Sequence, residues 1–197
     1  MKILAIADME DAYLWDHYQP GRLSDIDLIL SAGDLKSEYL SFLVTMANRP
    51  LLYVHGNHDG VYAQKPPEGC ECVDDTLVRI NGLRILGLGG VKLYSGGPQQ
   101  YSEKQMRNRI RKLAWKLYRA GGVDIVLTHA APAGYGDAED IAHRGFEAFL
   151  PLLDRYHPAY LVHGHVHQNY RAHNFHRETD YHGTTVLNAA GKVTFEI

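Results

Sequence analysis

The stretch Val54-His55-Gly56-Asn57-His58-Asp59 closes a short apolar run, Leu51–His55, with side chains of the metal-binding type. The same arrangement follows four other apolar runs. Their polar segments are Asp8-Met9-Glu10, Gly33-Asp34, Thr128-His129 and Gly164-His165-Val166-His167. If the runs are parallel strands, their carboxyl ends meet along one edge of a sheet. Six or seven side chains that bind metals would then converge there, which predicts a site for two ions.

Apolar runs alternate with segments of helical spacing, which indicates an α/β protein. Buried strands are expected over Ile3–Ala7, Ile26–Ser31, Leu51–His55, Val123–Thr128 and Tyr160–His163. Helices are expected over Ser37–Ala47, Ser102–Ala120 and Arg144–Tyr156. Pro151 should kink or split the third helix, because proline removes a backbone donor.

Two features argue against a plain doubly wound sheet. Asn81-Gly82 between Thr76–Ile80 and Leu83–Leu88 is a strong hairpin signal. The C-terminal part is rich in short β-segments, near Tyr170–Asn174, Thr184–Asn188 and Val193–Ile197. A single domain over residues 1–197, built as a sandwich of two mixed sheets with helices outside, fits this pattern best.

Composition bounds the class of protein. The chain has 197 residues, of which 45% are hydrophobic, enough for one domain with a proper core. Lys and Arg total 20 against 23 Asp and Glu, so the charge of -3 demands neither nucleic acid nor membrane. No apolar run approaches the ~18 residues of a membrane span. The run Ile3–Ala7 is too short for a signal peptide, which favours a cytoplasmic protein.

Histidine is over-represented, with 12 in the chain, and it is the commonest metal ligand. Four histidines each follow an apolar run, and we interpret them as site residues: His58, His129, His165 and His167. The others lack that placement. Cys70 and Cys72 form a C-x-C pair that could bind a metal, but without a second pair we interpret them as ordinary loop thiols.

In order, the five polar segments read D-x-E, G-D, G-N-H-D, a single His and G-H-x-H. This order resembles the calcineurin-like metallophosphoesterases, whose segments run D-x-H, G-D, G-N-H-[DE], His and G-H-x-H. The resemblance extends from Asp8 to His167 and through the β-rich tail, and four of the five segments match. In the first segment, Glu10 stands where the family usually has histidine.

The resemblance implies a four-layer α/β/β/α sandwich with two metals at the strand ends. The residues that would hold the first metal are Asp8, Glu10 and His167. Those that would hold the second are Asn57, His129 and His165. Asp34 would bridge the two metals, and His58 would act as the catalytic acid.

Elementary chemistry supports these roles. Two cations ~3.5–4 Å apart repel strongly, so a carboxylate such as Asp34 is needed between them. The neutral carbonyl oxygen of Asn57 limits the charge at the second metal. His165 and His167, two positions apart, could reach separate metals from a tight turn. A metal-bridging hydroxide would attack phosphorus in line, and His58 could protonate the leaving oxygen or bind a phosphate oxygen.

Glu10 leaves two alternatives open. As a ligand, it replaces a neutral nitrogen with an anionic oxygen, which shifts preference from iron or zinc toward manganese or magnesium. Alternatively it turns away, and the first metal site is weak or empty. Two divalent ions are expected, manganese before iron, zinc, nickel or magnesium.

The substrate is less constrained. His143 and Arg144 lie in the loop after His129, where a guanidinium could bind a phosphate oxygen or simply pair with a nearby acid. Helix 104–119 has a basic face, which we interpret as solvated rather than as a nucleic-acid site.

The sequence therefore predicts a phosphoesterase of small phosphodiesters or phosphomonoesters, with diesters favoured. It predicts no membrane partner and leaves the oligomeric state open. Two alternatives remain: a nuclease that uses the same metals with helix 104–119, and a non-catalytic scaffold with a degenerate first metal site.

Overall fold

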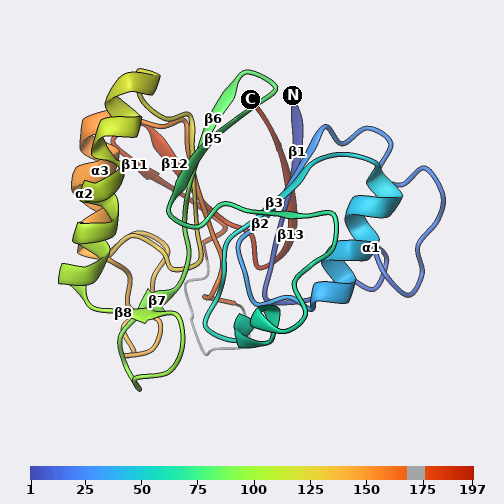
Figure 1. The fold of residues 1–197 in the computed structure, drawn as a ribbon, viewed down its shortest axis with the longest axis horizontal. Coiled ribbons are helices and arrows are strands. Elements are labelled where there is room, and N and C mark those ends of the chain that lie inside the picture. The colour runs from blue at the N-terminus through green and yellow to red at the C-terminus, as the bar shows by residue number, and fades with distance from the viewer. Residues whose placement is uncertain (168–175) are drawn as a thin grey trace.

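The computed structural model describes residues 1–167 and 176–197. Within them the chain forms two large sheets (Figure 1). The first runs in the order β13 (Gly191–Glu196), β1 (Lys2–Ala7), β2 (Leu28–Ser31), β3 (Leu51–Tyr53) and β4 (Glu71–Cys72). The second runs in the order β11 (Glu178–Tyr181), β12 (Thr184–Asn188), β10 (Tyr160–His163), β9 (Ile125–Thr128), β6 (Leu83–Leu88) and β5 (Thr76–Ile80). A small pair joins β7 (Val91–Lys92) to β8 (Gln100–Tyr101).

Helices cover the outer face of each sheet. Helix α1 (Ser37–Ala47) lies against the first sheet, and α2 (Glu103–Ala120) and α3 (Leu150–Tyr156) lie against the second (Figure 1). Three apolar clusters fill the three interfaces between the resulting four layers. The predicted four-layer α/β/β/α sandwich of two mixed sheets is confirmed.

Strand periodicity builds these layers. Successive side chains on a strand point to opposite faces, so a strand buried on both sides supplies two cores. In β1, Ala5 belongs to the core between the sheets and Ile6 to the core under α1. In β9, Leu127 faces the first sheet and Val126 faces α2 and α3. Such central strands therefore need uninterrupted apolar runs.

The hairpin prediction is confirmed in its turn as well as its strands. Strands β5 and β6 pair antiparallel with Ile80 opposite Leu83. Asn81 and Gly82 have φ of 49° and 89°, the left-handed pair that a type I′ turn needs.

The largest error in a predicted boundary is at the third helix, whereas three predicted strands differ by two residues at one end. The third helix does not start at Arg144, because a 3-10 turn, η2 (Glu147–Phe149), precedes α3 and Pro151 lies in the first turn of α3. Proline suits the first turn of a helix, where its missing amide breaks no intrahelical hydrogen bond, so Pro151 marks a helix start.

Short strands were missed, namely β4, β7, β8 and β11. Most have two residues, too few to show a period. The segment predicted near Tyr170–Asn174 lies outside the described residues. Among the described residues, no helix is long and apolar enough to span a membrane.

Candidate metal centre

Parallel strand pairing brings the predicted ligands to one edge of the sandwich. Strands β1, β2 and β3 are parallel neighbours, as are β9 and β10. The chain turns sharply just beyond three of these strands, and Asp8, Asp34 and His165 have φ of 62°, 57° and 67°. Asp and His tolerate this left-handed region better than most residues, although it is uncommon outside glycine. Such outliers cluster at functional sites, where they re-aim side chains.

Two glycines allow the turns to approach one another. A Cβ on Gly56 would lie 2.1 Å from Oδ1 of Asp34, and one on Gly164 would lie 2.7 Å from Oδ2 of Asp8. Both distances are far below van der Waals contact. The glycines of the G-N-H-D and G-H-x-H segments are therefore needed for the packing of the carboxylates themselves.

Asp34, His129 and His165 form the compact part of the centre. Their ligand atoms all lie within 4.8 Å of one another, and Nε2 of His129 is 3.3 Å from Oδ2 of Asp34. Nδ1 of His129 donates to the carbonyl of Ala32 at 2.6 Å, and Nε2 of His165 donates to the carbonyl of Ala142 at 2.8 Å. Because a carbonyl only accepts, each bond assigns a proton to that nitrogen and leaves the other ring nitrogen as a potential ligand. Burial works to lower the pKa of His129, but the charges of Asp34 and Asp8 raise it to about 9, so a cation would displace the proton on Nε2.

Two buried polar atoms test whether a cation fits here. Within the described part of the chain, neither Oδ1 of Asn57 nor Nε2 of His129 makes a hydrogen bond, although Nε2 of His129 is 3.3 Å from Oδ2 of Asp34 as an ion pair. A buried polar atom without a partner costs about 1–3 kcal/mol. A divalent cation beside Asp34 would satisfy both atoms with one carboxylate, one amide oxygen and imidazole nitrogens, a donor set that suits manganese or zinc.

The centre is electrostatically crowded. Burial raises the pKa of Asp8 to about 6, although the positive charge of His129 opposes the shift. Burial also works to raise the pKa of Asp34, but the charge of His129 and hydrogen bonds hold it below its ordinary value. Burial lowers the pKa of His165 to about 3, so this ring is neutral and available as a ligand.

Asp59 supports the backbone of the centre. Its Oδ2 accepts from the amides of Asp34 at 2.8 Å and Gly56 at 2.7 Å, and the residue is only 3% exposed. One buried carboxylate therefore ties together the ends of β2 and β3.

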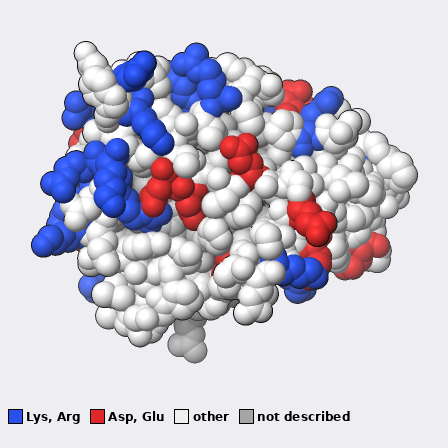
Figure 2. Space-filling view, in the orientation of Figure 1, with Lys and Arg blue, Asp and Glu red and all other residues white. Residues whose placement is uncertain are grey.

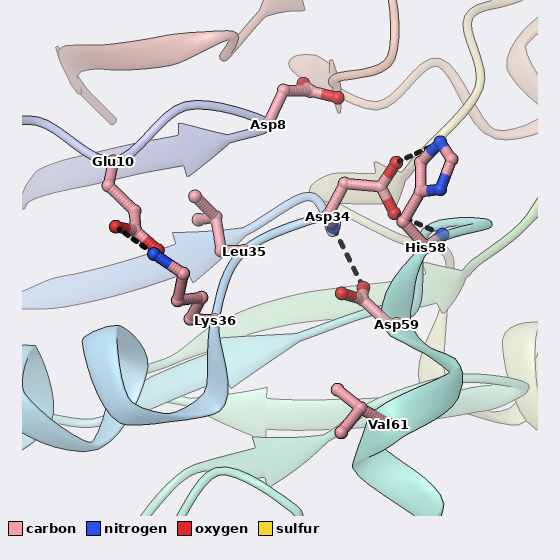
Figure 3. Close-up of a pocket in the computed structure, with 8 residues that line it drawn as sticks. All are labelled: Asp8, Glu10, Asp34, Leu35, Lys36, His58, Asp59 and Val61. Atoms are coloured by element: carbon pink, nitrogen blue, oxygen red, sulfur yellow. Dashed lines mark hydrogen bonds and ion pairs between the residues drawn. The ribbon is translucent and has the colours of Figure 1, made fainter.

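Glu10 lies apart from this compact group. Its Oε2 is 3.1 Å from Nζ of Lys36, and the side chain points toward that lysine rather than toward Asp8 and Asp34 (Figure 3). His167 is half-buried at the end of the G-H-x-H segment. The predicted ligands of the first metal are thus less closely assembled than Asp34, His129 and His165.

A cavity of about 550 Å³ opens beside the centre. It is lined by Asp8, Glu10, Asp34, Leu35, Lys36, His58, Asp59 and Val61 (Figure 3). The His58 side chain is 78% exposed, and its Nε2 lies 4.0 Å from Oδ2 of Asp34. Its backbone amide donates to Oδ1 of Asp34 at 2.8 Å. His58 is therefore held at its backbone while its ring can meet a ligand from solution.

These segments, in this order and at these strand ends, agree with a match between residues 1–169 and the calcineurin-like phosphoesterase family. The chain belongs to that family. The UPF0046 protein K07C11.7 of Caenorhabditis elegans is 27% identical over 189 residues, covering 84% of this chain and 63% of that protein. The chain thus spans less than two thirds of that relative's length.

Solved structures share the fold of this family member. One crystal structure superposes with a TM-score of 0.69 at 14% identity, covering 98% of this chain and 93% of its own. The crystal structure of TT1561 from Thermus thermophilus gives 0.59 at 15% identity, covering 96% of this chain and 89% of its own. At these identities the likeness shows the architecture alone.

The two predicted substrate residues of this phosphoesterase-family chain differ in burial. His143 is buried, and its ring centroid is 4.7 Å from that of His165. Its Nδ1 lies 2.8 Å from Oδ1 of Asp140. Arg144 is exposed, and its Nε donates to the carbonyl of Glu139 at 3.2 Å. The fold brings His143 to the metal centre and leaves Arg144 at the surface.

Two contacts at the site were not predicted from the sequence. The hydroxyl of Tyr94 accepts from Nδ2 of Asn57 at 3.3 Å, which fixes which end of the amide is left for a cation. Lys36 pairs with Glu10 at the cavity. Both Tyr94 and Lys36 lie outside strand runs and outside the family's segments, so no local pattern predicted these two contacts.

Proposed function

We propose that this chain is a phosphoesterase that uses two divalent cations to hydrolyse small phosphate esters, with diesters preferred to monoesters. The observation that carries the proposal is the pair of buried atoms beside Asp34 that make no hydrogen bond in the described structure, Oδ1 of Asn57 and Nε2 of His129. Family membership supports a hydrolytic reaction at this centre. The geometry supports a cation at the position that those atoms face.

The residues divide into two sets. Asn57, His129 and His165 would hold one cation, with Asp34 shared. The other cation would be held by Asp8, His167 and Glu10. When bound, the cations would supply Lewis acidity toward the phosphoryl oxygens and make water nucleophilic near neutral pH. Manganese is the preferred ion because the set combines carboxylate and amide oxygens with imidazole.

The chain's own groups supply orientation and a proton. Asp34 is held by the amide of His58 and, through its own amide, by Asp59. The exposed ring of His58 reaches over the cavity and would donate a proton to the leaving alkoxide oxygen or a hydrogen bond to a phosphoryl oxygen. His143, packed beside His165, would limit where the ester can lie.

Charge favours a diester. Four carboxylates and one ammonium group line the cavity. Two divalent cations would leave little net positive charge there, which suits a monoanionic diester better than a dianionic monoester. The cavity volume of about 550 Å³ fits a small ester.

The test compares two substrates with manganese present. We expect bis(p-nitrophenyl) phosphate to be hydrolysed faster than p-nitrophenyl phosphate, and Asp34→Asn to abolish both activities. Lys65→Gln serves as the control, because Lys65 is exposed, pairs with Glu38 and does not line the cavity. Absence of hydrolysis with any divalent ion would favour a non-catalytic scaffold.

A second candidate, a nuclease, is favoured by the surface of α2. The helix exposes six basic residues, Lys104, Arg107, Arg111, Lys112, Lys116 and Arg119. Figure 2 shows Lys and Arg gathered on the side of the molecule where α2 lies in Figure 1. Trp115 and Tyr118 are 66% and 70% exposed and stack with ring centroids 5.8 Å apart.

Exposed aromatic rings among cations are a platform for unpaired bases. Arg109 does not contribute, because it binds Asp75 and the carbonyl of Gly89. Steeply salt-dependent binding of single-stranded DNA or RNA, lost in Trp115→Ala, would favour the nuclease.

A further inference from the structure

A second group of ligand-type side chains lies just before the G-N-H-D segment. His55 follows β3, Cys72 ends β4, and Asp74 follows β4 on the way to β5. Nδ1 of His55 is 2.6 Å from Oδ2 of Asp74 and 3.7 Å from Sγ of Cys72, and all three ligand atoms lie within 4.8 Å of one another. Cys72 is exposed, and the His55 and Asp74 side chains are about one fifth exposed, so solvent reaches the group.

The contacts converge on a single ring nitrogen. A catalytic triad would use both nitrogens of the histidine, one for the thiol and one for the carboxylate. Here the thiol and the carboxylate face the same Nδ1, which carries at most one proton to share between them. A cation in the place of that proton would serve the nitrogen, the sulfur and the oxygen together.

We propose that His55, Cys72 and Asp74 form a binding site for a thiophilic divalent cation of the zinc class. Zinc binds sulfur at ~2.3 Å and imidazole nitrogen at ~2.0 Å in tetrahedral geometry, which places the two ligand atoms roughly 3.5 Å apart. The observed 3.7 Å between Sγ and Nδ1 agrees. Oδ2 of Asp74 is 2.6 Å from Nδ1, so the two atoms would separate to roughly 3.3 Å when a tetrahedral cation replaces the shared proton. Water would complete the coordination, and the thiol and imidazole protons would leave as the cation binds.

Backbone amides hold the carboxylate of the proposed site. Oδ1 of Asp74 accepts from the amide of Gly89 at 2.7 Å, and Oδ2 accepts from the amide of His55 at 3.3 Å. Two backbone segments therefore hold the carboxylate close to the position from which it would bind the cation. A bound cation would join the end of β3 to the end of β4, two residues ahead of Asn57.

Cys70 provides a matched control. It lies two residues from Cys72, but its side chain is half-buried and packs against the core under α1. It is not one of the three clustered ligands. Comparing variants of Cys70 and Cys72 therefore distinguishes the proposed site from metal binding by any thiol.

The first experiment titrates the full chain with Cd²⁺ and follows the thiolate-to-metal absorption. The proposed catalytic centre contains no cysteine, so this signal reports the thiolate site alone. We expect one equivalent of signal, kept in Cys70→Ser and lost in Cys72→Ser. No signal in the unmutated chain, or a signal lost in Cys70→Ser and kept in Cys72→Ser, would overturn the proposal.

The second experiment uses Cys70→Ser, in which Cys72 is the remaining thiol, since the chain has 2 cysteines. We expect Zn²⁺ to slow alkylation of Cys72 at least tenfold, and His55→Gln to remove most of that protection. Protection must persist in Cys70→Ser/Asp34→Asn, which lacks the proposed catalytic bridge. If zinc protects Cys72 no better than Mg²⁺, or if His55→Gln is protected equally, the site is excluded whatever the outcome for hydrolysis.

Discussion

Gly56→Ala tests whether the close packing of the strand-end turns holds the metal centre together. The backbone of Gly56 lies outside the left-handed region, so alanine is permitted there and the new methyl group is the whole perturbation. Its Cβ would lie 2.1 Å from Oδ1 of Asp34 and 2.8 Å from Cε1 of His129. Both are residues of the compact group.

The expected losses of activity and stability in Gly56→Ala follow from these distances. Restoring ordinary contact requires the Asp34 carboxylate or the 55–58 segment to move by more than about 1 Å, and such a displacement of a reacting group costs on the order of 100-fold in rate. Overpacking of this kind also lowers the free energy of unfolding by about 1–3 kcal/mol. For a chain of this size, that corresponds to a fall in Tm of roughly 2–12 °C.

The matched control is Gly60→Ala. Gly60 is four positions along the same segment, and the nearest atom to its added Cβ is Cγ of Pro98 at 3.9 Å, an ordinary contact. We expect Gly60→Ala to keep its manganese content, measured by elemental analysis, and its hydrolysis of bis(p-nitrophenyl) phosphate. Gly56→Ala should lose most of both. Full metal content and activity in Gly56→Ala would refute the argument that Asp34 must keep its place.

Three further predictions concern the first metal site, the binding of manganese and the Arg84–Asp124 ion pair. Glu10→His should raise the affinity of the first metal site for zinc or iron, measured by competition with manganese, because it replaces an anionic oxygen with an imidazole nitrogen. Manganese at 100 times its Kd should increase the free energy of unfolding by about 2.7 kcal/mol, so Tm should be higher than in EDTA. Asp34→Asn should remove this gain. Asp124→Asn should lower the free energy of unfolding by about 1.5–3 kcal/mol at neutral pH, because Arg84 binds this carboxylate and lowers its pKa. A carboxyl whose pKa is lowered by folding stabilises the fold at pH values above its ordinary pKa near 3.8. Urea titrations should therefore show the difference in stability between Asp124→Asn and the unmutated chain vanishing as the pH falls through the folded-state pKa.

The strand core and its site residues could be predicted because the determining interactions are local in sequence. An apolar run such as that of β1 must be buried on both faces, and the polar residue after it must emerge at a sheet edge. Asn81-Gly82 fixes its own turn through backbone preference. The order of the five polar segments then identified the family.

Other features depend on contacts between distant segments. The Glu10–Lys36 pair joins residues 26 positions apart, and Tyr94 reaches Asn57 across 37. No period or turn preference encodes either contact. Cys72 looked like an ordinary loop thiol because its neighbours His55 and Asp74 are brought to it by pairing of β3 with β4, a strand of two residues.

The Glu10–Lys36 ion pair decides how the first metal site should behave. The lysine side chain is 72% exposed, so the pair is worth only about 0–1 kcal/mol. A divalent cation at Asp8 would outcompete so weak a partner, and Glu10 would then leave Lys36 to bind the metal. Removing the lysine charge should therefore strengthen the weaker of two manganese-binding steps by up to about fivefold, the factor that corresponds to 1 kcal/mol.

Lys36→Gln tests this argument by calorimetric titration with manganese. The stronger step, assigned to Asn57, His129 and His165, should change little because those ligands do not contact Lys36. The control is Lys65→Gln, which breaks a comparably exposed pair with Glu38 away from the cavity. An unchanged weaker step in Lys36→Gln would mean that Glu10 does not ligate the first metal, since releasing it from the lysine would then make no difference to binding.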